Sequence, residues 1–163
     1  MRAPTEEQRA LLSGRRYAVL ATHDPGGSIH QTPVWFLFED DRFYVESNSG
    51  SRKVGNLRRA PTASITVDVR RPGSDCWVSA AGAAEIVSGD EAAALNARIR
   101  TRYLTPEAIE DPRIGPVFAA ADDVTIRLTP VEWRSWSAQD VDERFFGGIL
   151  GRTPAHWFLP LEA

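Results

Sequence analysis

Short strand-like segments separated by turn signals constrain the fold of this chain most. The segments Tyr17–Thr22 and Ile29–Phe38 flank the turn sequence Asp24-Pro25-Gly26-Gly27, and Arg42–Ser47 follows a turn at Asp40-Asp41. Further strands are predicted over Thr62–Val69, Cys76–Val87, Asp123–Leu128 and Val131–Ser137. Short strands joined by turns are typical of antiparallel sheets, whereas a parallel sheet needs alternating strands and helices, which this pattern lacks. The sequence therefore predicts a mainly β protein with inserted helices, folded as a closed or split antiparallel barrel of six or seven strands.

Details of this pattern give more specific expectations. We expect Ile29–Phe38 to pair with Arg42–Ser47 in a meander, and we expect a bulge or close backbone approach at Gly82. Helices are predicted over Thr5–Arg15, where Thr5 and Gln8 can form a capping box, then after Gly50, over Asp90–Tyr103, and in broken form over Thr105–Ala120. The pattern fades from Gln139. We therefore divide the chain into a barrel domain, 1–138, and a C-terminal tail, 139–163, that packs on a partner or lacks regular structure.

Length and composition exclude several classes of protein. A chain of 163 residues forms one ordinary domain, and its net charge of -3 gives no general attraction to nucleic acid. Cys76 is the only cysteine, and the three histidines are widely spaced, so neither a disulfide within the chain nor a metal site is expected. No signal peptide and no apolar run of about 20 residues is present, which favours a cytoplasmic protein without a membrane span.

The segment Ser47–Pro61, with the sequence SNSGSRKVGNLRRAP, is the candidate binding element. A Ser/Gly-rich turn leads into a short basic helix in which Ser51 is a potential N-cap. A helix start attracts anions, and Arg52 and Lys53 add two positive charges there, so the segment suits a phosphate. Ser47, at the end of the preceding strand, is a further candidate. Alternatively, this helix is an ordinary amphipathic helix with a solvated basic face.

A second candidate element is the segment Gln31, Thr32, Pro33 and Val34. Pro33 cannot donate a backbone hydrogen bond, so this strand is expected at a sheet edge or at a bulge, with backbone groups free for a ligand. Trp77 is a candidate aromatic cover for a ligand, with core packing as its alternative. The chain carries no G-x-S-x-G elbow, metal triad or dinucleotide fingerprint, which moves the candidate chemistry to a bound cofactor. The sequence indicates no particular residue as a general acid or base.

Three ordered runs carry a family resemblance: ATHDPGGSIHQTPVWF, RFYVESNSGSRKVGNLRRAPTASITVD and CWVSAAGAAEI. They resemble the pyridoxamine 5'-phosphate oxidase-like split barrels, whose members use FMN or the deazaflavin F420. The resemblance covers about residues 5 to 137, and S-R-K-x-x-N-L-R-R-x-P is its most specific part. It implies a six-stranded split β-barrel, a homodimer with the cofactor at the subunit interface, and binding of the cofactor phosphate by Ser51, Arg52 and Lys53.

Departures from the true pyridoxamine phosphate oxidases refine this implication. The stretch Gln31–Phe36 lacks their basic residues, and the last strands lack their Arg and His motif, so oxidation of vitamin B6 is not expected. The P-V-W-F, R-x-R-Y and W-R-S-W segments look more like the actinobacterial F420-dependent branch, which makes F420 the first choice and FMN the second. The resemblance thus implies an oxidoreductase that transfers a hydride between this cofactor and a small organic acceptor. The alternatives are a non-catalytic flavin- or haem-binding carrier and, from the basic helix alone, a nucleic-acid or interaction domain.

Overall fold

The fold was obtained as a computed structural model, and the structure describes residues 4–71, 73–152 and 159. The strands are β1 (Ala18–His23), β2 (Ile29–Val34), β3 (Leu37–Glu39), β4 (Arg42–Asn48), β5 (Thr62–Val69), β6 (Cys76–Val87) and β7 (Asp123–Ser137). The helices are α1 (Glu6–Ser13), α2 (Arg52–Arg59), α3 (Gly89–Tyr103), α4 (Pro106–Glu110), α5 (Gly115–Ala120), α6 (Ala138–Val141), the π-helical turn η1 (Asp142–Phe146) and α7 (Ile149–Arg152).

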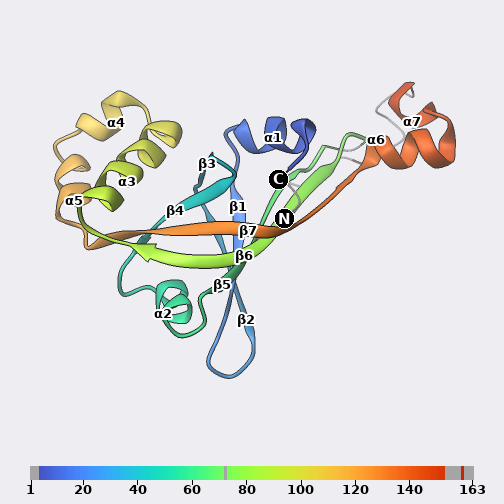
Figure 1. The fold of residues 1–163 in the computed structure, drawn as a ribbon. Coiled ribbons are helices and arrows are strands. Elements are labelled where there is room, and N and C mark those ends of the chain that lie inside the picture. The colour runs from blue at the N-terminus through green and yellow to red at the C-terminus, as the bar shows by residue number, and fades with distance from the viewer. Residues whose placement is uncertain (1–3, 72, 153–158, 160–163) are drawn as a thin grey trace.

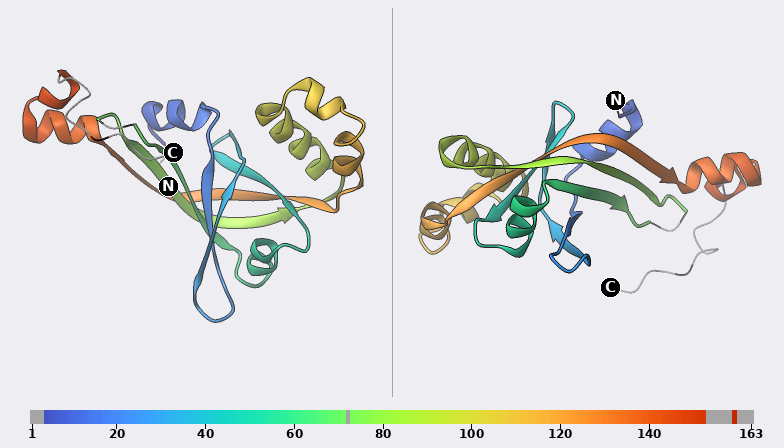
Figure 2. Two further views of the ribbon diagram at one scale, coloured as in Figure 1. Left: turned by 180° about the vertical axis from the view of Figure 1, so that it is seen from behind. Right: turned by 60° about the horizontal axis from the view of Figure 1, so that its bottom comes forward.

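All seven strands form one antiparallel sheet in the order β2-β1-β5-β6-β7-β4-β3. The sheet curls strongly, so that the β1–β2 hairpin crosses the long β6–β7 ribbon (Figures 1 and 2). Helices α3, α4 and α5 lie at one end of this ribbon, and α6 and α7 lie at its other end (Figure 1). The prediction of a mainly β split barrel with inserted helices is confirmed, with seven strands in place of six.

The predicted strand Ile29–Phe38 is two strands, because the chain turns at Trp35 and Phe36. The Tyr103 hydroxyl of α3 fixes this corner: it accepts a hydrogen bond from the N–H of Phe36 at 3.2 Å and donates one to the carbonyl of Arg16 at 2.5 Å. The Tyr103 ring also stacks on Trp35, with centroids 5.0 Å apart. The predicted pairing with Arg42–Ser47 is therefore correct for β3 and wrong for β2, which pairs with β1 and is an edge strand, as Pro33 indicated.

The predicted break between the last two strands is also wrong. β7 runs without interruption through Thr129 and Pro130, and the register against β6 shifts between Ala81 and Gly82. A Cβ atom at Gly82 would lie 2.0 Å from the carbonyl oxygen of Thr129, so only glycine fits there. Proline is tolerated at such a bulge because no regular ladder bond is required of it. The bulge predicted at Gly82 thus explains how β7 remains continuous.

The core lies inside the curled sheet and is closed by two helices. α1 contributes Leu12, and α2 contributes Val54 and Leu57, all of them buried with the inward residues of the strands. The capping box predicted between Thr5 and Gln8 is present at the start of α1. α3 covers the outer side of β4 with a smaller cluster that includes Leu95 and Ile99. The helix in the middle of segment 47–61 is thereby packed on the core of the barrel.

Beyond the barrel, residues 138–152 form three short helical turns rather than an irregular tail. The buried carboxylate of Asp142 organises this arm, since it accepts hydrogen bonds from the N–H groups of Leu150 and Gly151 at 2.9 and 2.7 Å. The arm projects past the end of β6 and β7 (Figure 1). Packing of the tail on a partner stays a prediction, and the rest of the tail lies outside the described residues. No described helix has the length and apolar character needed to cross a membrane.

Candidate functional site

The candidate site begins at the connection between β4 and α2, residues 47–51, which we call the anchor loop. Ser47 is buried at the end of β4, and its hydroxyl lies 2.8 Å from the hydroxyl of Ser51. The loop is also held by the residue that precedes β7, because the carbonyl of Asp122 accepts the N–H of Ser49 at 2.8 Å. It is fixed from α2 by Arg58, whose Nη1 donates to the carbonyl of Ser49 at 3.0 Å. The two predicted serines therefore meet in one defined place.

The start of α2 lacks a side-chain cap. Ser51 occupies the N-cap position as predicted, but its hydroxyl faces Ser47 and makes no capping hydrogen bond. The first intrahelical bond runs from the N–H of Gly55 to the carbonyl of Ser51. The N–H groups of the first helical turn are consequently left without a side-chain acceptor, and they carry the positive end of the helix dipole. Such a helix start binds anions readily.

The guanidinium of Arg52 pairs with a carboxylate of the β1–β2 turn. Its Nε and Nη2 donate to the two carboxylate oxygens of Asp24 at 2.8 and 2.6 Å. Asn56, one helical turn further on, donates to Asp24 at 2.9 Å and to the hydroxyl of Thr22 at 3.0 Å. Hydrogen bonds from Arg52 and then Asn56 lower the pKa of Asp24 to about 2, so this buried carboxyl group is ionised at neutral pH. Arg52 therefore joins α2 to the β1–β2 turn, while the rest of its side chain remains exposed.

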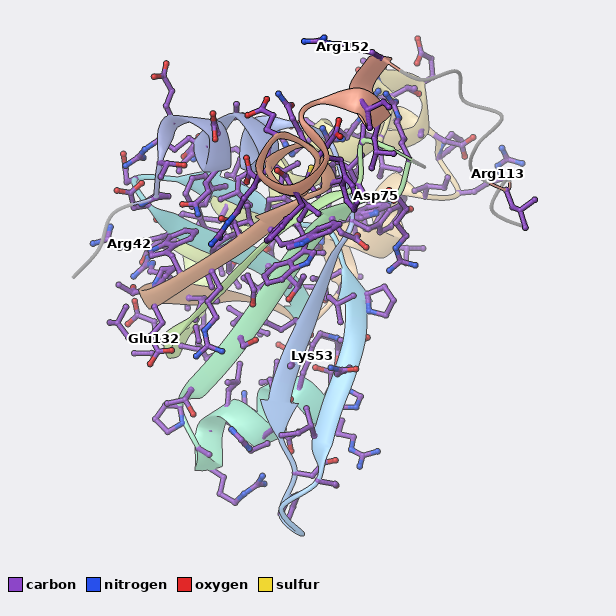
Figure 3. All side chains as sticks on the ribbon, turned by 90° about the vertical axis from the view of Figure 1, so that its right-hand side faces the viewer. Arg42, Lys53, Asp75, Arg113, Glu132 and Arg152 are labelled. Atoms are coloured by element: carbon purple, nitrogen blue, oxygen red, sulfur yellow. The ribbon has the colours of Figure 1, made fainter. Side chains whose placement is uncertain are left out.

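Lys53 differs from Arg52 in having no counterion. It is the only lysine of the chain, it is half-buried, and it forms no hydrogen bond or ion pair with any residue that the structure describes. Desolvation by the surrounding protein lowers the pKa of its ammonium group. Figure 3 shows Lys53 toward the end of the molecule that carries α2 and the β1–β2 hairpin. A half-buried cation at an uncapped helix start favours an anionic ligand, because the ligand would restore the interactions lost on burial.

The candidate ligand wall on β2 does not present all four of its residues on one face. Gln31 and Pro33 are exposed, Val34 is buried in the core, and Thr32 is partly buried on the same side as Val34. Successive strand residues point to opposite faces, so only Gln31 and Pro33 are free to contact a ligand on the outer face. Two of the four predicted residues of β2, Gln31 and Pro33, are therefore accessible to a ligand.

Gln31 belongs to an outer-face pocket of about 720 Å³. The strand register brings Gln31, Ala21, Ser64, Ala81 and Glu132 side by side across five strands. Most of these side chains are small, which leaves a shallow floor. β1 connects the pocket to α2, since Thr22 lines the pocket and accepts the hydrogen bond from Asn56.

Trp77 lies apart from this pocket. It stands four residues before Ala81 on β6, roughly 13 Å along the strand at the usual rise per residue. It lines a separate pocket of about 470 Å³ together with its cross-strand neighbour Trp136 and residues of α1. The structure therefore brings the Ser47 and Ser51 hydroxyls together and places Lys53 in the first turn of α2, whereas Trp77 lies with α1 and the arm.

Sequence reasoning missed Asp24 and Asn56. Asp24 was assigned only to a turn, and its pairing with Arg52 spans 28 residues of sequence. The available signal was the spacing of Arg52 and Asn56, which puts two hydrogen-bond donors on one helix face. That spacing indicates a shared acceptor without identifying it. Among the described residues no group of His, Cys, Asp and Glu could hold a metal ion.

The family model described as "Pyridoxamine 5'-phosphate oxidase" matches residues 4–137, which include the anchor loop, α2 and all seven strands. No curated protein sequence matches the chain.

Solved structures give matches over most of the chain. The conserved hypothetical protein Rv2991 from Mycobacterium tuberculosis is 28% identical with a TM-score of 0.70, covering 85% of this chain and 88% of that one. A protein described as an F420 reductase is 24% identical with a TM-score of 0.64, covering 80% and 98%. HutZ, a heme storage protein from Vibrio cholerae, is 18% identical with a TM-score of 0.62, covering 83% and 95%. The last two likenesses concern the fold alone.

Proposed function

Because the chain belongs to the pyridoxamine 5'-phosphate oxidase family, we propose that it is a flavin-type oxidoreductase that transfers a hydride between bound F420 or FMN and a small organic acceptor. When bound, either cofactor supplies the hydride chemistry through its ring system, so the protein has only to bind and orient it. F420 is the first choice because of the sequence segments that resemble F420-dependent proteins. FMN is the second choice, since its phosphate would suit the same cations.

One observation carries this proposal: Lys53 is half-buried at the uncapped start of α2 and has no counterion among the residues that the structure describes. A cofactor phosphate there would accept hydrogen bonds from Lys53, from the Ser47 and Ser51 hydroxyl groups and from the first N–H groups of the helix. Arg52 would contribute its charge while its fork remains on Asp24. These groups fit a phosphate in charge and in hydrogen-bonding type.

The outer-face pocket is the proposed place for the ring. Its floor of small residues, including Ala21 and Ala81, admits a flat molecule, and Gln31 offers an amide at its edge. Ile29 and Val131 line the same pocket and are 52% and 50% exposed. We propose that a second copy of the chain covers these apolar side chains, which would place the cofactor at the interface of a homodimer and exclude water from the ring.

The fold does not choose between turnover and simple binding. Its structural relatives include both the F420 reductase and the heme storage protein. A non-catalytic carrier of a flavin or haem therefore remains the second candidate. It predicts tight cofactor binding without reduction of any acceptor.

The test is to record the visible spectrum of the purified protein and then to titrate it with F420 and with FMN. Binding of one cofactor at or below micromolar concentration, followed by reduction of a quinone, enone or nitroaromatic acceptor, would support the proposal. Binding without turnover would support the carrier, and binding of neither cofactor would exclude the proposed site. Light scattering with and without the cofactor measures whether the bound form is a dimer.

A further inference from the structure

Arg100 of α3 is a largely enclosed arginine that pairs with two carboxylates, and its Nη1 also donates to the carbonyl oxygen of Phe118 at 3.5 Å. Its guanidinium contacts Glu46 of β4, with Nε at 2.7 Å, and Asp123 of β7, with Nη2 at 2.8 Å. The side chain is 14% exposed, and both carboxylate side chains are 16% exposed. The ring of Phe118 from α5 lies 4.3 Å from the guanidinium carbon and covers it. One cation therefore joins two strands and two helices.

We propose that Arg100 is a positioning residue for the anchor loop, and that it holds the end of β4 in the orientation in which Ser47, Ser51 and Lys53 receive a phosphate. The identity of the ligand rests on the function proposed above. The ordering of the loop rests only on contacts within the chain. The two parts can therefore be tested separately.

Side chains alternate between the two faces of β4. Glu46 and Ser47 are consecutive, so their side chains point to opposite faces of the strand. Glu46 faces α3 and is held there by Arg100, while Ser47 faces the hydroxyl of Ser51. Fixing Glu46 restrains rotation of the strand end about its axis. The same restraint sets the direction of the Ser47 hydroxyl.

Arg100 also contacts β7, the strand that lies beside β4. Arg100 fixes Asp123, and the neighbouring Asp122 binds the anchor loop from the other side. The Asp122 carbonyl accepts the Ser49 N–H at 2.8 Å and the Asn48 side-chain amide at 3.3 Å, and its carboxylate accepts the Ser49 hydroxyl. Arg100 thus acts on the loop through both strands that border it, without itself reaching the start of α2.

The contacts of residue 100 require an arginine rather than a lysine. A planar guanidinium can serve two carboxylates and stack on a ring at once, whereas a lysine ammonium lacks both the fork and the flat face. Burial raises the pKa of Glu46, and Arg100 opposes that shift. Removal of Arg100 would leave two enclosed carboxylates facing each other. Arg100→Lys keeps the positive charge and removes only the fork and the flat face, so it tests the geometry of the contact without leaving the carboxylates unpaired.

The experiment compares Arg100→Lys with Arg98→Lys. Arg98 lies on the same helix and pairs with a carboxylate, Glu39, at a half-exposed site away from the anchor loop. Amide hydrogen exchange of residues 47–51 is measured first, without any ligand. Binding is then measured for each cofactor and for its phosphate-free form, riboflavin or the deazaflavin chromophore. We expect Arg100→Lys to speed exchange in the loop about tenfold and to weaken the phosphate-bearing form about tenfold, with the phosphate-free form and Arg98→Lys unchanged.

Each other outcome overturns part of the proposal. Unchanged loop exchange in Arg100→Lys would exclude the positioning role. Equal losses for the phosphate-bearing and phosphate-free forms would reduce Arg100 to a general structural residue. If the unmodified protein binds neither cofactor, the proposed function fails, while the exchange measurement still decides whether Arg100 orders the loop. If Arg100→Lys fails to fold, the double variant Glu46→Gln, Asp123→Asn, which removes both partners and leaves the arginine, takes its place with the same expectations.

Discussion

The carboxylate of Asp24 accepts both Nε and Nη2 of Arg52, and this pair joins the β1–β2 turn to the start of α2. Because Asn56 donates to the same carboxylate, Asp24 is the acceptor at the centre of a buried network. Its lowered pKa means that the folded state prefers the ionised form. The connection between the turn and the anchor therefore depends on pH.

We expect Asp24→Asn to lower the melting temperature at neutral pH, since the neutral amide loses the paired interaction with Arg52. The folded pKa of about 2 lies below the ordinary 3.8, so this stabilisation is present above about pH 4 and is lost as the pH falls toward 2. The difference between the two proteins should shrink over that interval in thermal melts. Asp68→Asn, which breaks an exposed pair with Arg70, is the control and should change little. A constant difference from pH 6 to pH 2 would contradict this account.

Replacing Lys53 tests the phosphate anchor directly. Lys53→Ala should weaken binding of the phosphate-bearing cofactor by on the order of 1.5 to 3 kcal/mol, the scale of a charge-assisted hydrogen bond. Isothermal titration with F420 and FMN measures the loss, and the phosphate-free chromophores should bind as before. Arg144→Ala, on the C-terminal arm, removes a charge far from α2 and serves as the control. Unchanged affinity in Lys53→Ala would place the phosphate elsewhere.

The lowered pKa of Lys53 gives a second, independent measurement. A larger fraction of this amine is unprotonated near neutral pH than of an ordinary lysine with a pKa of 10.5, so it should react faster with amine-directed reagents. Because the chain has one lysine, peptide mapping separates this reaction from that of the N-terminal amine. The bound cofactor should protect Lys53, and its affinity should fall as the pH rises through the lowered pKa. Labelling that the cofactor does not slow would argue against direct contact.

How much of this could be read from the sequence depends on how local each interaction is. The Ser/Gly-rich turn before α2, the capping box of α1 and a glycine in the middle of a strand are visible in the local sequence, and they were predicted. The break at Trp35 and Phe36 was not, because it depends on Tyr103 from a helix far along the chain. The continuity of β7 through Pro130 depends in the same way on Gly82 across the sheet.

In the candidate site, too, local features were predicted and long-range contacts were not. Serine and lysine at a helix start are visible in a local pattern, and the structure places Ser51 at the N-cap of α2 and Lys53 in its first turn. The partner of Arg52 depends on how α2 docks against the β1–β2 turn, and the exposed face of β2 depends on how this strand is packed in the sheet. Trp77 fits a strand pattern as well as any other tryptophan, and its separation from the outer-face pocket becomes visible only once the register is known.

The bulge offers a prediction about stability that is independent of any ligand. In Gly82→Ala the new methyl group would meet the Thr129 carbonyl at 2.0 Å and the Pro130 Cα at 2.9 Å, so the backbone of β7 must move. We expect a loss of about 1 to 3 kcal/mol, typical of overpacking in a well-packed region. Gly55→Ala is the matched control: nothing lies within 4 Å of its added carbon, and it sits inside α2, where alanine is favoured over glycine by roughly 1 kcal/mol. Urea unfolding should move the two midpoints in opposite directions. A neutral Gly82→Ala would show that β6 and β7 can separate at the bulge, and the strand continuity through Pro130 would then need another cause.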